Sequence, residues 1–225
     1  MYKEALITYF KGDHLKITKI CEKFGFNVKL YNKGNKDLGI KVKNIGVDVY
    51  DKFHYIINNY YNLPDLLLFL TDTSFDDIKK KRVIDFVLEN HYILYEKSGF
   101  LTGHIQRIKK DDIDFLLDEY KGKKLIKSLY RPYSLWFKKT INENINIKDT
   151  YVSKKGVFAV TKDLILSNPI EFYKKILSEI ESSSIRGHDS EVTHYWERAY
   201  TELFCKNNTK LMFHNFSRYG PINDT

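Results

Sequence analysis

The run Leu66–Leu70 limits the folds open to this chain more than any other segment. Five large apolar residues stand in a row there, directly after Pro64 and Asp65 and before the polar triplet TDT at 71–73. A run of this length is too short for a membrane-crossing helix and is typical of a strand that is buried on both faces. Such strands belong to mostly parallel sheets with helices on both sides. We therefore predict an α/β fold with a mostly parallel central sheet flanked by helices.

Strand-like and helix-like segments alternate ahead of this run. Short apolar segments at 5–10 and 27–31 predict strands, and a helical spacing of apolar residues lies between them at 17–24. A second helical pattern begins at Val49 and stops before Pro64. This order predicts an open sheet whose ligands bind beyond the carboxyl ends of the strands.

That rule makes the residues at the ends of the three predicted strands candidates for a binding site. They are Thr8 and Tyr9 with the loop that follows, then Tyr31, Asn32 and Lys33, and finally Thr71, Asp72 and Thr73.

The second half of the chain predicts helices at 111–120, 133–141, 169–180 and 190–205, with a buried strand at 156–160. No internal repeat or linker interrupts it. We expect a single domain that spans residues 1–225.

The net charge is +8, from 37 basic and 29 acidic residues. An excess of this size suits nucleic acid, an anionic membrane surface or a small anionic ligand such as a nucleotide. The longest basic run is only Lys79–Arg82, and Asp76 and Asp77 precede it. A basic stripe typical of nucleic-acid binding is therefore not visible, although a basic nucleic-acid-binding module stays open as a rival class.

Two isolated cysteines, Cys21 and Cys205, suggest reduced thiols rather than a disulfide framework. No apolar run is long enough to cross a bilayer. We expect a cytoplasmic protein without a transmembrane segment, and leave peripheral contact with a membrane open.

Asp72 has two interpretations. A carboxylate after a buried strand can hold Mn²⁺ or Mg²⁺, which prefer oxygen ligands and often share a diphosphate. The alternative is an aspartate that caps a helix beginning near Ser74.

The segment NIGVD at 44–48 is similarly open. Asn44 and Asp48 would bind the hydroxyls of a sugar or ribose, and Gly46 would let the backbone approach closely. The alternative is a tight turn in which Asp48 caps the following helix.

His194 and Glu197 lie on the last predicted helix, where the apolar stripe from Val192 to Leu203 turns both away from the core. That face is either solvated or lines a cleft in which the pair acts as acid or base.

Several segments taken together resemble a known family. They are YNKG at 31–34, NIGVD at 44–48, HYIINNYYNLPDLLLFL at 54–70, GVFAVTKDLILSNPIEFYKKIL at 156–177 and YWERAYTELF at 195–204. Their order and spacing resemble a domain family, formerly of unknown function, with bacterial, fungal and large-DNA-virus members. That family is similar to glycosyltransferases of the GT-A fold, and the resemblance covers roughly residues 5–205.

The resemblance implies a GT-A-like domain with a donor-binding half at about 1–100 and an acceptor-side half at about 101–225. It implies a hexosyl- or deoxyhexosyltransferase that takes a UDP- or GDP-sugar, usually with Mn²⁺ or Mg²⁺, and glycosylates a glycan or glycoprotein, as in polysaccharide biosynthesis. It does not imply a nucleic-acid partner. GT-A enzymes carry an Asp-x-Asp metal motif, whereas the corresponding segment here is TDT at 71–73, with Asp72 alone.

The resemblance also suggests a role for each candidate. Donor-binding residues would be Thr8, Tyr9, Tyr31, Lys33, Asn44, Gly46, Asp48, Thr71 and Thr73, with Lys33 neutralising diphosphate charge. Asp72 would carry the metal, and Glu197 and His194 would be catalytic, Glu197 as general base if the reaction inverts. A catalytically inactive protein that binds a nucleotide or glycan is the alternative, because the second aspartate is missing.

Overall fold

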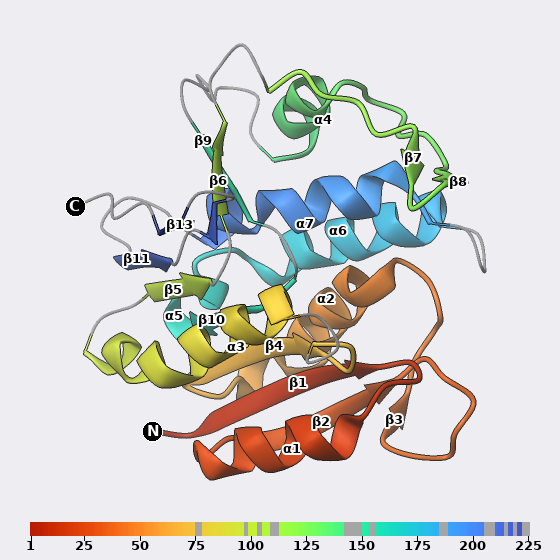
Figure 1. Ribbon diagram of the computed structural model, residues 1–225. Helices are drawn as coiled ribbons and strands as arrows, with labels where there is room; N and C mark the ends of the chain where they lie inside the picture. The colour runs from red at the N-terminus through yellow and green to blue at the C-terminus, as the bar shows by residue number, and fades with distance from the viewer. Residues whose placement is uncertain are drawn as a thin grey trace.

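A seven-stranded sheet runs through the centre of the molecule in the computed structural model (Figure 1). The structure describes residues 1–74, 78–96, 99–102, 105–108, 113–141, 150–153, 156–184, 189–204, 210–213, 216–217 and 220–221. In spatial order the strands are β3 (Ile40–Lys41), β2 (Asn27–Asn32), β1 (Lys3–Tyr9), β4 (Leu66–Thr71), β10 (Phe158–Thr161), β5 (Gly99–Thr102) and β11 (Lys210–Phe213).

The sheet is mostly parallel, as predicted. Four of its six strand pairings are parallel, and only β10 runs antiparallel to its two neighbours. The chain leaves β1 toward β2 and β3, then returns to β4 on the other side of β1. The strand order therefore reverses between β1 and β4, and a reversal of this kind marks where open α/β sheets bind ligands.

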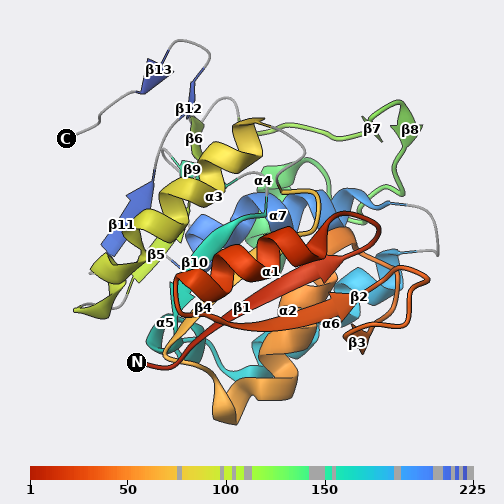
Figure 2. The ribbon, with the colours of Figure 1, turned by 60° about the horizontal axis from the view of Figure 1, so that its bottom comes forward.

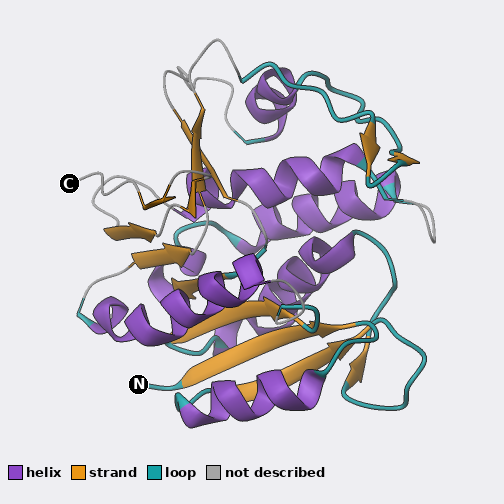
Figure 3. Cartoon of the chain, in the orientation of Figure 1, coloured by secondary structure: helices purple, strands orange, loops and turns teal. Residues whose placement is uncertain are grey.

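Helices cover both faces of the sheet (Figures 2 and 3). One face carries α1 (His14–Lys23) and α3 (Ile78–Asn90). The other carries α2 (Val47–Asn59), α4 (Tyr133–Thr140), α6 (Ile170–Ser183) and α7 (Glu191–Phe204), with the short α5 (Lys162–Leu166) after β10. The 3-10 turns η1 (Tyr60–Asn62) and η2 (His91–Tyr95) follow α2 and α3.

The apolar run Leu66–Leu70 packs against helices on both faces of the sheet. Leu67 and Phe69 pack with α2, α6 and α7, whereas Leu66, Leu68 and Leu70 pack with α1 and α3. All five side chains are at most 1% exposed. The prediction of a strand buried on both faces is confirmed, and full burial of each such side chain contributes roughly 1.5–3 kcal/mol.

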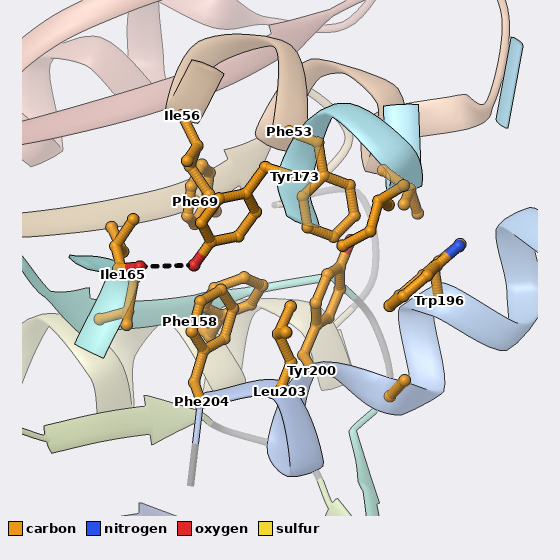
Figure 4. Close-up of a cluster of buried hydrophobic side chains, with 14 of the residues drawn as sticks. Phe53, Ile56, Phe69, Phe158, Ile165, Tyr173, Trp196, Tyr200, Leu203 and Phe204 are labelled. Atoms are coloured by element: carbon orange, nitrogen blue, oxygen red, sulfur yellow. Dashed lines mark hydrogen bonds between the residues drawn. The ribbon is translucent and has the colours of Figure 1, made fainter. Parts of the chain in front are cut away.

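Aromatic rings fill the core between the sheet and helices α2, α4, α6 and α7 (Figure 4). The ring of Phe158 lies 4.6 Å from that of Tyr200 and 4.9 Å from that of Phe69. The Tyr173 hydroxyl donates to the carbonyl of Ile165 at 2.8 Å, which satisfies the polar end of a fully buried ring. Many of the aromatic side chains of this protein therefore serve packing.

Three small antiparallel pairs lie outside the main sheet. They are β6 (Ile105–Ile108) with β9 (Thr150–Ser153), β7 (Glu119–Tyr120) with β8 (Lys123–Lys124), and β12 (Phe216–Ser217) with β13 (Gly220–Pro221). Among the described residues, none of the helices combines the length and apolar character that crossing a bilayer requires.

The helix expected at 111–120 is wrong for its described part. Residues 113–118 are irregular and 119–120 form β7. Ile113, Phe115 and Leu117 face inward while Asp114 and Leu116 are exposed, which is the two-residue period of extended chain. The backbone of this segment forms hydrogen bonds with other elements. For example, the Tyr133 N–H donates to the Phe115 carbonyl at 3.1 Å.

The other helices are confirmed with small changes at their ends. Helix α6 begins at Ile170 after Pro169, and the Asn168 side chain does not cap it but contacts Tyr173 instead. At α7, the Ser190 hydroxyl accepts from the Thr193 N–H at 3.3 Å, as a cap does. Cys21 is a buried free thiol, and Cys205 lies outside the described residues.

Candidate functional site

An open cleft of about 880 Å³ lies beyond the carboxyl ends of β1, β2 and β3. Its lining comes from the three segments that follow these strands: 9–11, 33–36 and 41–45. Among the described residues that line the cleft there are five lysines, namely Lys11, Lys33, Lys36, Lys41 and Lys43, and no aspartate or glutamate. Because Lys33 and Lys43 are each paired with a carboxylate outside this lining, Lys11, Lys36 and Lys41 supply most of the positive charge at the edge of the sheet where a ligand was expected.

Asn32 organises the loop that carries two of these lysines. Its buried side-chain amide donates to the carbonyls of Lys36 and Leu38, at 2.6 and 2.8 Å. Its amide oxygen accepts from the Gly34 N–H at 2.8 Å. One side chain thus holds the backbone of the whole turn after β2, so the cleft wall is preorganised.

Gly34 brings this turn against the loop after β1. A Cβ atom at this position would lie 2.1 Å from the carbonyl oxygen of Phe10. Only glycine permits that approach, because any side chain would push the two loops apart. The cleft floor therefore depends on this residue of the YNKG segment.

Three of the cleft lysines have contacts that orient them. The Lys41 ammonium donates to the carbonyl of Gly34, and the Lys43 ammonium lies 2.7 Å from Oε1 of Glu181 on α6. The Lys36 ammonium lies 6.0 Å from the centre of the Tyr9 ring. The Tyr9 ring is fully buried, so what the cleft offers to a ligand is mainly cations, which suit a phosphate group.

Asp72 bridges the point where the strand order reverses. Its Oδ2 accepts from the backbone N–H groups of Phe10, Lys11 and Gly12, at 2.7, 2.7 and 2.6 Å. Asp72 follows β4, whereas its three donors follow β1, so the buried carboxylate ties the two strand ends together. Charge-assisted bonds of this kind are strong, and they hold the loop that supplies Lys11 to the cleft.

These contacts do not fit the metal role expected of Asp72. An oxygen that already accepts three hydrogen bonds has no lone pair left for a cation, so only Oδ1 remains. Within the described ranges, no group of three or more His, Cys, Asp or Glu side chains is arranged to hold a metal ion. In the described part of the chain the carboxylate bonds the loop after β1, and residues 75–77, where the helix-capping alternative would place its donors, lie outside the described residues.

The neighbouring threonines support the turn after β4. The Thr71 hydroxyl lies 3.0 Å from the Ser74 hydroxyl, and Thr73 accepts from the Lys80 ammonium at 3.1 Å. Neither threonine is among the residues that line the cleft.

A buried ion cluster lies behind the cleft, on the first two turns of α2. The Lys33 ammonium lies 3.2 Å from Oδ1 of Asp51 and donates to the carbonyls of Ile45, at 2.5 Å, and Val47. Burial raises the pKa of Asp51 to about 6, against the opposing effect of Lys33. Burial also lowers the pKa of Lys33, so both shifts report the same dry environment.

A second pair extends the cluster toward the core. The Lys52 ammonium contacts the Asp48 carboxylate one turn away, and both residues are buried. Lys52 also lies 5.6 Å from the centre of the Tyr200 ring on α7. Asp48 does not cap α2, because Gly46 occupies the cap position in the left-handed conformation, with φ of 60°. A Cβ at Gly46 would also meet Ile180 of α6 at 2.5 Å, so packing explains this glycine.

A third group of charged side chains is centred on α7. His194 is buried, not solvated: its Nε2 lies 3.2 Å from Oδ2 of Asp189, and its Nδ1 lies 3.7 Å from Oε2 of Glu197. The Tyr120 ring covers it, with ring centres 4.5 Å apart. Burial lowers the pKa of His194, but the two carboxylates outweigh it and raise the pKa to about 9. The expected solvated face of α7 is therefore wrong at His194.

Glu197 keeps a quarter of its side chain exposed. Burial raises its pKa, but His194, Arg198 and Lys52 together leave the pKa below its ordinary value. A charged carboxylate at partly exposed depth is chemically able to accept a proton.

The structure brings some of the candidates together and separates others. Tyr9, Lys33 and Asn44 line the cleft. Thr8 lies level with Tyr31 and Thr71 across β1, β2 and β4, and its hydroxyl faces Asp51. Tyr31 belongs to the core, where its ring packs on His54 and Tyr55.

Sequence reasoning did not single out Asp51 or four of the five cleft lysines, and it included Asn32 only by its place in the candidate segment 31–33. The lysines had a signal, since four of the five fall between residues 33 and 43. Asp51 had none, because its partner Lys33 lies on another element.

No protein-family model matches this chain, and a search of curated proteins finds no match to it.

Proposed function

We propose that this protein is a glycosyltransferase that binds a nucleotide-diphosphate sugar, UDP- or GDP-linked, in the lysine-lined cleft. The acceptor is a glycan or a glycosylated protein, and the sugar is a hexose or deoxyhexose. One observation carries the proposal: in the part of the chain that the structure describes, five lysines and no carboxylate line a cleft at the carboxyl ends of parallel strands. A diphosphate is the ligand that such a concentration of cations suits best.

The reaction transfers the sugar carbon from a diphosphate oxygen to an acceptor hydroxyl. The carbon–oxygen bond to the diphosphate breaks and its electron pair leaves with the diphosphate, while the acceptor oxygen forms the new bond and loses its proton. Lys11 and Lys36 would stabilise the charge that develops on the leaving group, which is where electrostatic catalysis has most effect. The Tyr9 ring is fully buried, so it would support the loop after β1 and not stack on the base.

Glu197 is the candidate general base on the acceptor side, and His194 positions it from 3.7 Å away. Glu197 is ionised and so able to accept a proton, although its lowered pKa makes it a weaker base than an ordinary glutamate. Asn44, at the mouth of the cleft, would contact the sugar or ribose.

Manganese or magnesium enters the proposal only as a variable to test. The hydrogen bonds of Asp72 do not fit ligation through Oδ2, so no step is assigned to a metal. The same observation favours a second candidate function, a protein that binds a nucleotide or glycan without transferring the sugar.

Titration calorimetry with UDP, GDP and a panel of their sugars, each with and without Mn²⁺, tests the proposal. The pair Lys11→Ala and Lys36→Ala should weaken binding of the best ligand roughly tenfold per lysine, while Lys19→Ala and Lys23→Ala on α1 leave it unchanged. Failure of every nucleotide and nucleotide sugar to bind would exclude the glycosyltransferase and the nucleotide-binding form of the alternative. Binding without release of free nucleoside diphosphate in the presence of acceptors would favour the inactive binding protein.

A further inference from the structure

The segment 113–141 forms a lobe on the outside of α7 (Figure 1). It contains β7, β8 and α4 and is here called the outer lobe. Its two limbs run side by side, since the Leu125 N–H donates to the Asp118 carbonyl at 2.9 Å and the Tyr133 N–H to the Phe115 carbonyl at 3.1 Å.

Large apolar side chains of the outer lobe are exposed. Leu129, at 87%, is more exposed than any other large apolar side chain in the described part of the chain. The others in the lobe are Leu116, Tyr120, Tyr130 and Leu135, at 40–51%. Exposed apolar groups gathered on one projecting element mark a site of interaction.

The backbone that carries Leu129 is held firmly. Glu191 of α7 is fully buried and accepts from the N–H groups of Leu117 and Ser128, at 2.9 and 3.0 Å. Its Oε2 also lies 2.7 Å from Nε of Arg131. Leu129 therefore projects from a preorganised turn, and its exposure does not come from a loose loop.

Exposed lysines belong to the same segment as these apolar side chains. They are Lys121, Lys123, Lys124, Lys127, Lys138 and Lys139. The acidic residues of the lobe are only Asp114, Asp118 and Glu119, and Asp118 already pairs with Arg131 at 2.7 Å. The outer lobe thus combines a net positive charge with projecting leucine and tyrosine side chains.

We infer that the outer lobe docks the protein on the surface of an anionic lipid bilayer. The leucines and tyrosines enter the interface between headgroups and acyl chains, and the lysines stay at the level of the anionic headgroups. Both contributions are needed, because one or two apolar side chains alone give weak binding. Nucleic acid would use the lysines but would leave Leu129 in water, so lipid accounts for more of the observed surface.

Cosedimentation with vesicles tests this inference and needs no donor, so its outcome is independent of the proposed reaction. One vesicle set is phosphatidylcholine alone, and the other contains roughly 30 mol% phosphatidylserine, which gives a negative surface potential. The protein should sediment with the anionic set only. Equal binding to both sets, or to neither, would overturn the inference.

Two variants separate the contributions. Leu129→Asp should lower the anionic-vesicle partition at least tenfold, and so should the triple change Lys121→Gln, Lys123→Gln, Lys124→Gln, since each lysine contributes roughly fivefold. The matched controls on α1, on the far side of the sheet, are Leu15→Asp and the triple Lys16→Gln, Lys19→Gln, Lys23→Gln. All four changes are at exposed positions, and circular dichroism verifies the fold.

Controls that lose as much binding as the lobe variants would contradict the assignment of the surface. Binding of single-stranded RNA that the lysine triple weakens, while Leu129→Asp leaves vesicle binding intact, would overturn the lipid partner in favour of nucleic acid.

Discussion

Lys33 and Asp51 form an ion pair, 3.2 Å from Nζ to Oδ1, in which neither side chain is more than 3% exposed. The same Lys33 belongs to the lining of the cleft. The wall of the candidate binding site is therefore joined directly to α2 by a buried charge pair, and a change in one affects the other.

Replacing Lys33 alone should make the protein less stable. Lys33→Met leaves Asp51 buried without its partner and should lower the free energy of unfolding by about 3–5 kcal/mol. Adding Asp51→Leu removes the stranded charge, so the double variant should recover much of that loss. Urea denaturation measures both, and a double variant no more stable than Lys33→Met would contradict the pairing.

Asp72→Ala should act through the loop and not through a metal. Three backbone N–H groups lose their acceptor, which should lower the free energy of unfolding by about 2–4 kcal/mol. Because the loop also supplies Lys11 to the cleft, the affinity for the nucleotide should fall by the same factor with and without Mn²⁺. A loss of affinity confined to the titration with Mn²⁺ would instead return Asp72 to the role of metal ligand.

Asn32→Ala should reduce the affinity for the nucleotide more than it reduces the stability of the fold. The change releases the carbonyls of Lys36 and Leu38 and the N–H of Gly34, so the turn after β2 loses its internal support. We expect about tenfold weaker binding by calorimetry. Asn27→Ala, at the exposed other end of the same strand, is the control and should bind normally.

His194 should make stability depend on pH above neutrality. Its pKa in the folded protein, about 9, exceeds the ordinary value of 6.5, so its charged form stabilises the fold fully below pH 6.5. That stabilisation, roughly 3 kcal/mol, declines as the pH rises through about 9. The difference in unfolding free energy between the wild type and His194→Gln should therefore shrink from pH 6 to pH 10. A difference that stays constant would show that Asp189 and Glu197 do not hold the proton on His194.

Glu191→Ala should release the outer lobe from α7. The change removes the acceptor of two backbone N–H groups and the partner of Arg131, at a cost of about 3 kcal/mol or more. Limited proteolysis should then cut within 113–131 faster than in the wild type. Glu171→Ala, which breaks only the exposed pair with Lys174, should leave the cleavage rate unchanged.

The sheet was largely predictable because its strongest signals are local. Five apolar residues in a row at 66–70 require burial on both faces, and the structure confirms this. The segment 111–120 was misread because inward residues at 113, 115 and 117 satisfy an extended period as well as an incomplete helical one. Only its contacts with Tyr133 and Glu191 decide between the two.

The site was less predictable because its parts come from separate segments. Lys11 stands far from Lys43 in sequence, and each looks like an ordinary solvated lysine until the fold brings both to one cleft. His194 was misplaced because hydrophobic spacing assigns polar residues to the outside, whereas Asp189 and Tyr120 cover this one. Periodicity detects a core but not a buried charge with a distant partner.

The position of β10 has a consequence for synthesis of the chain. This strand, Phe158–Thr161, pairs with β4 on one side and β5 on the other, so it enters the middle of the sheet late. Until β10 has left the ribosome, one edge of β4 (Leu66–Thr71) has unpaired backbone groups. This strand also contains the most apolar run of the sequence. Such an edge is a template for intermolecular pairing, and a nascent chain halted before residue 158 is therefore expected to aggregate or to recruit a chaperone.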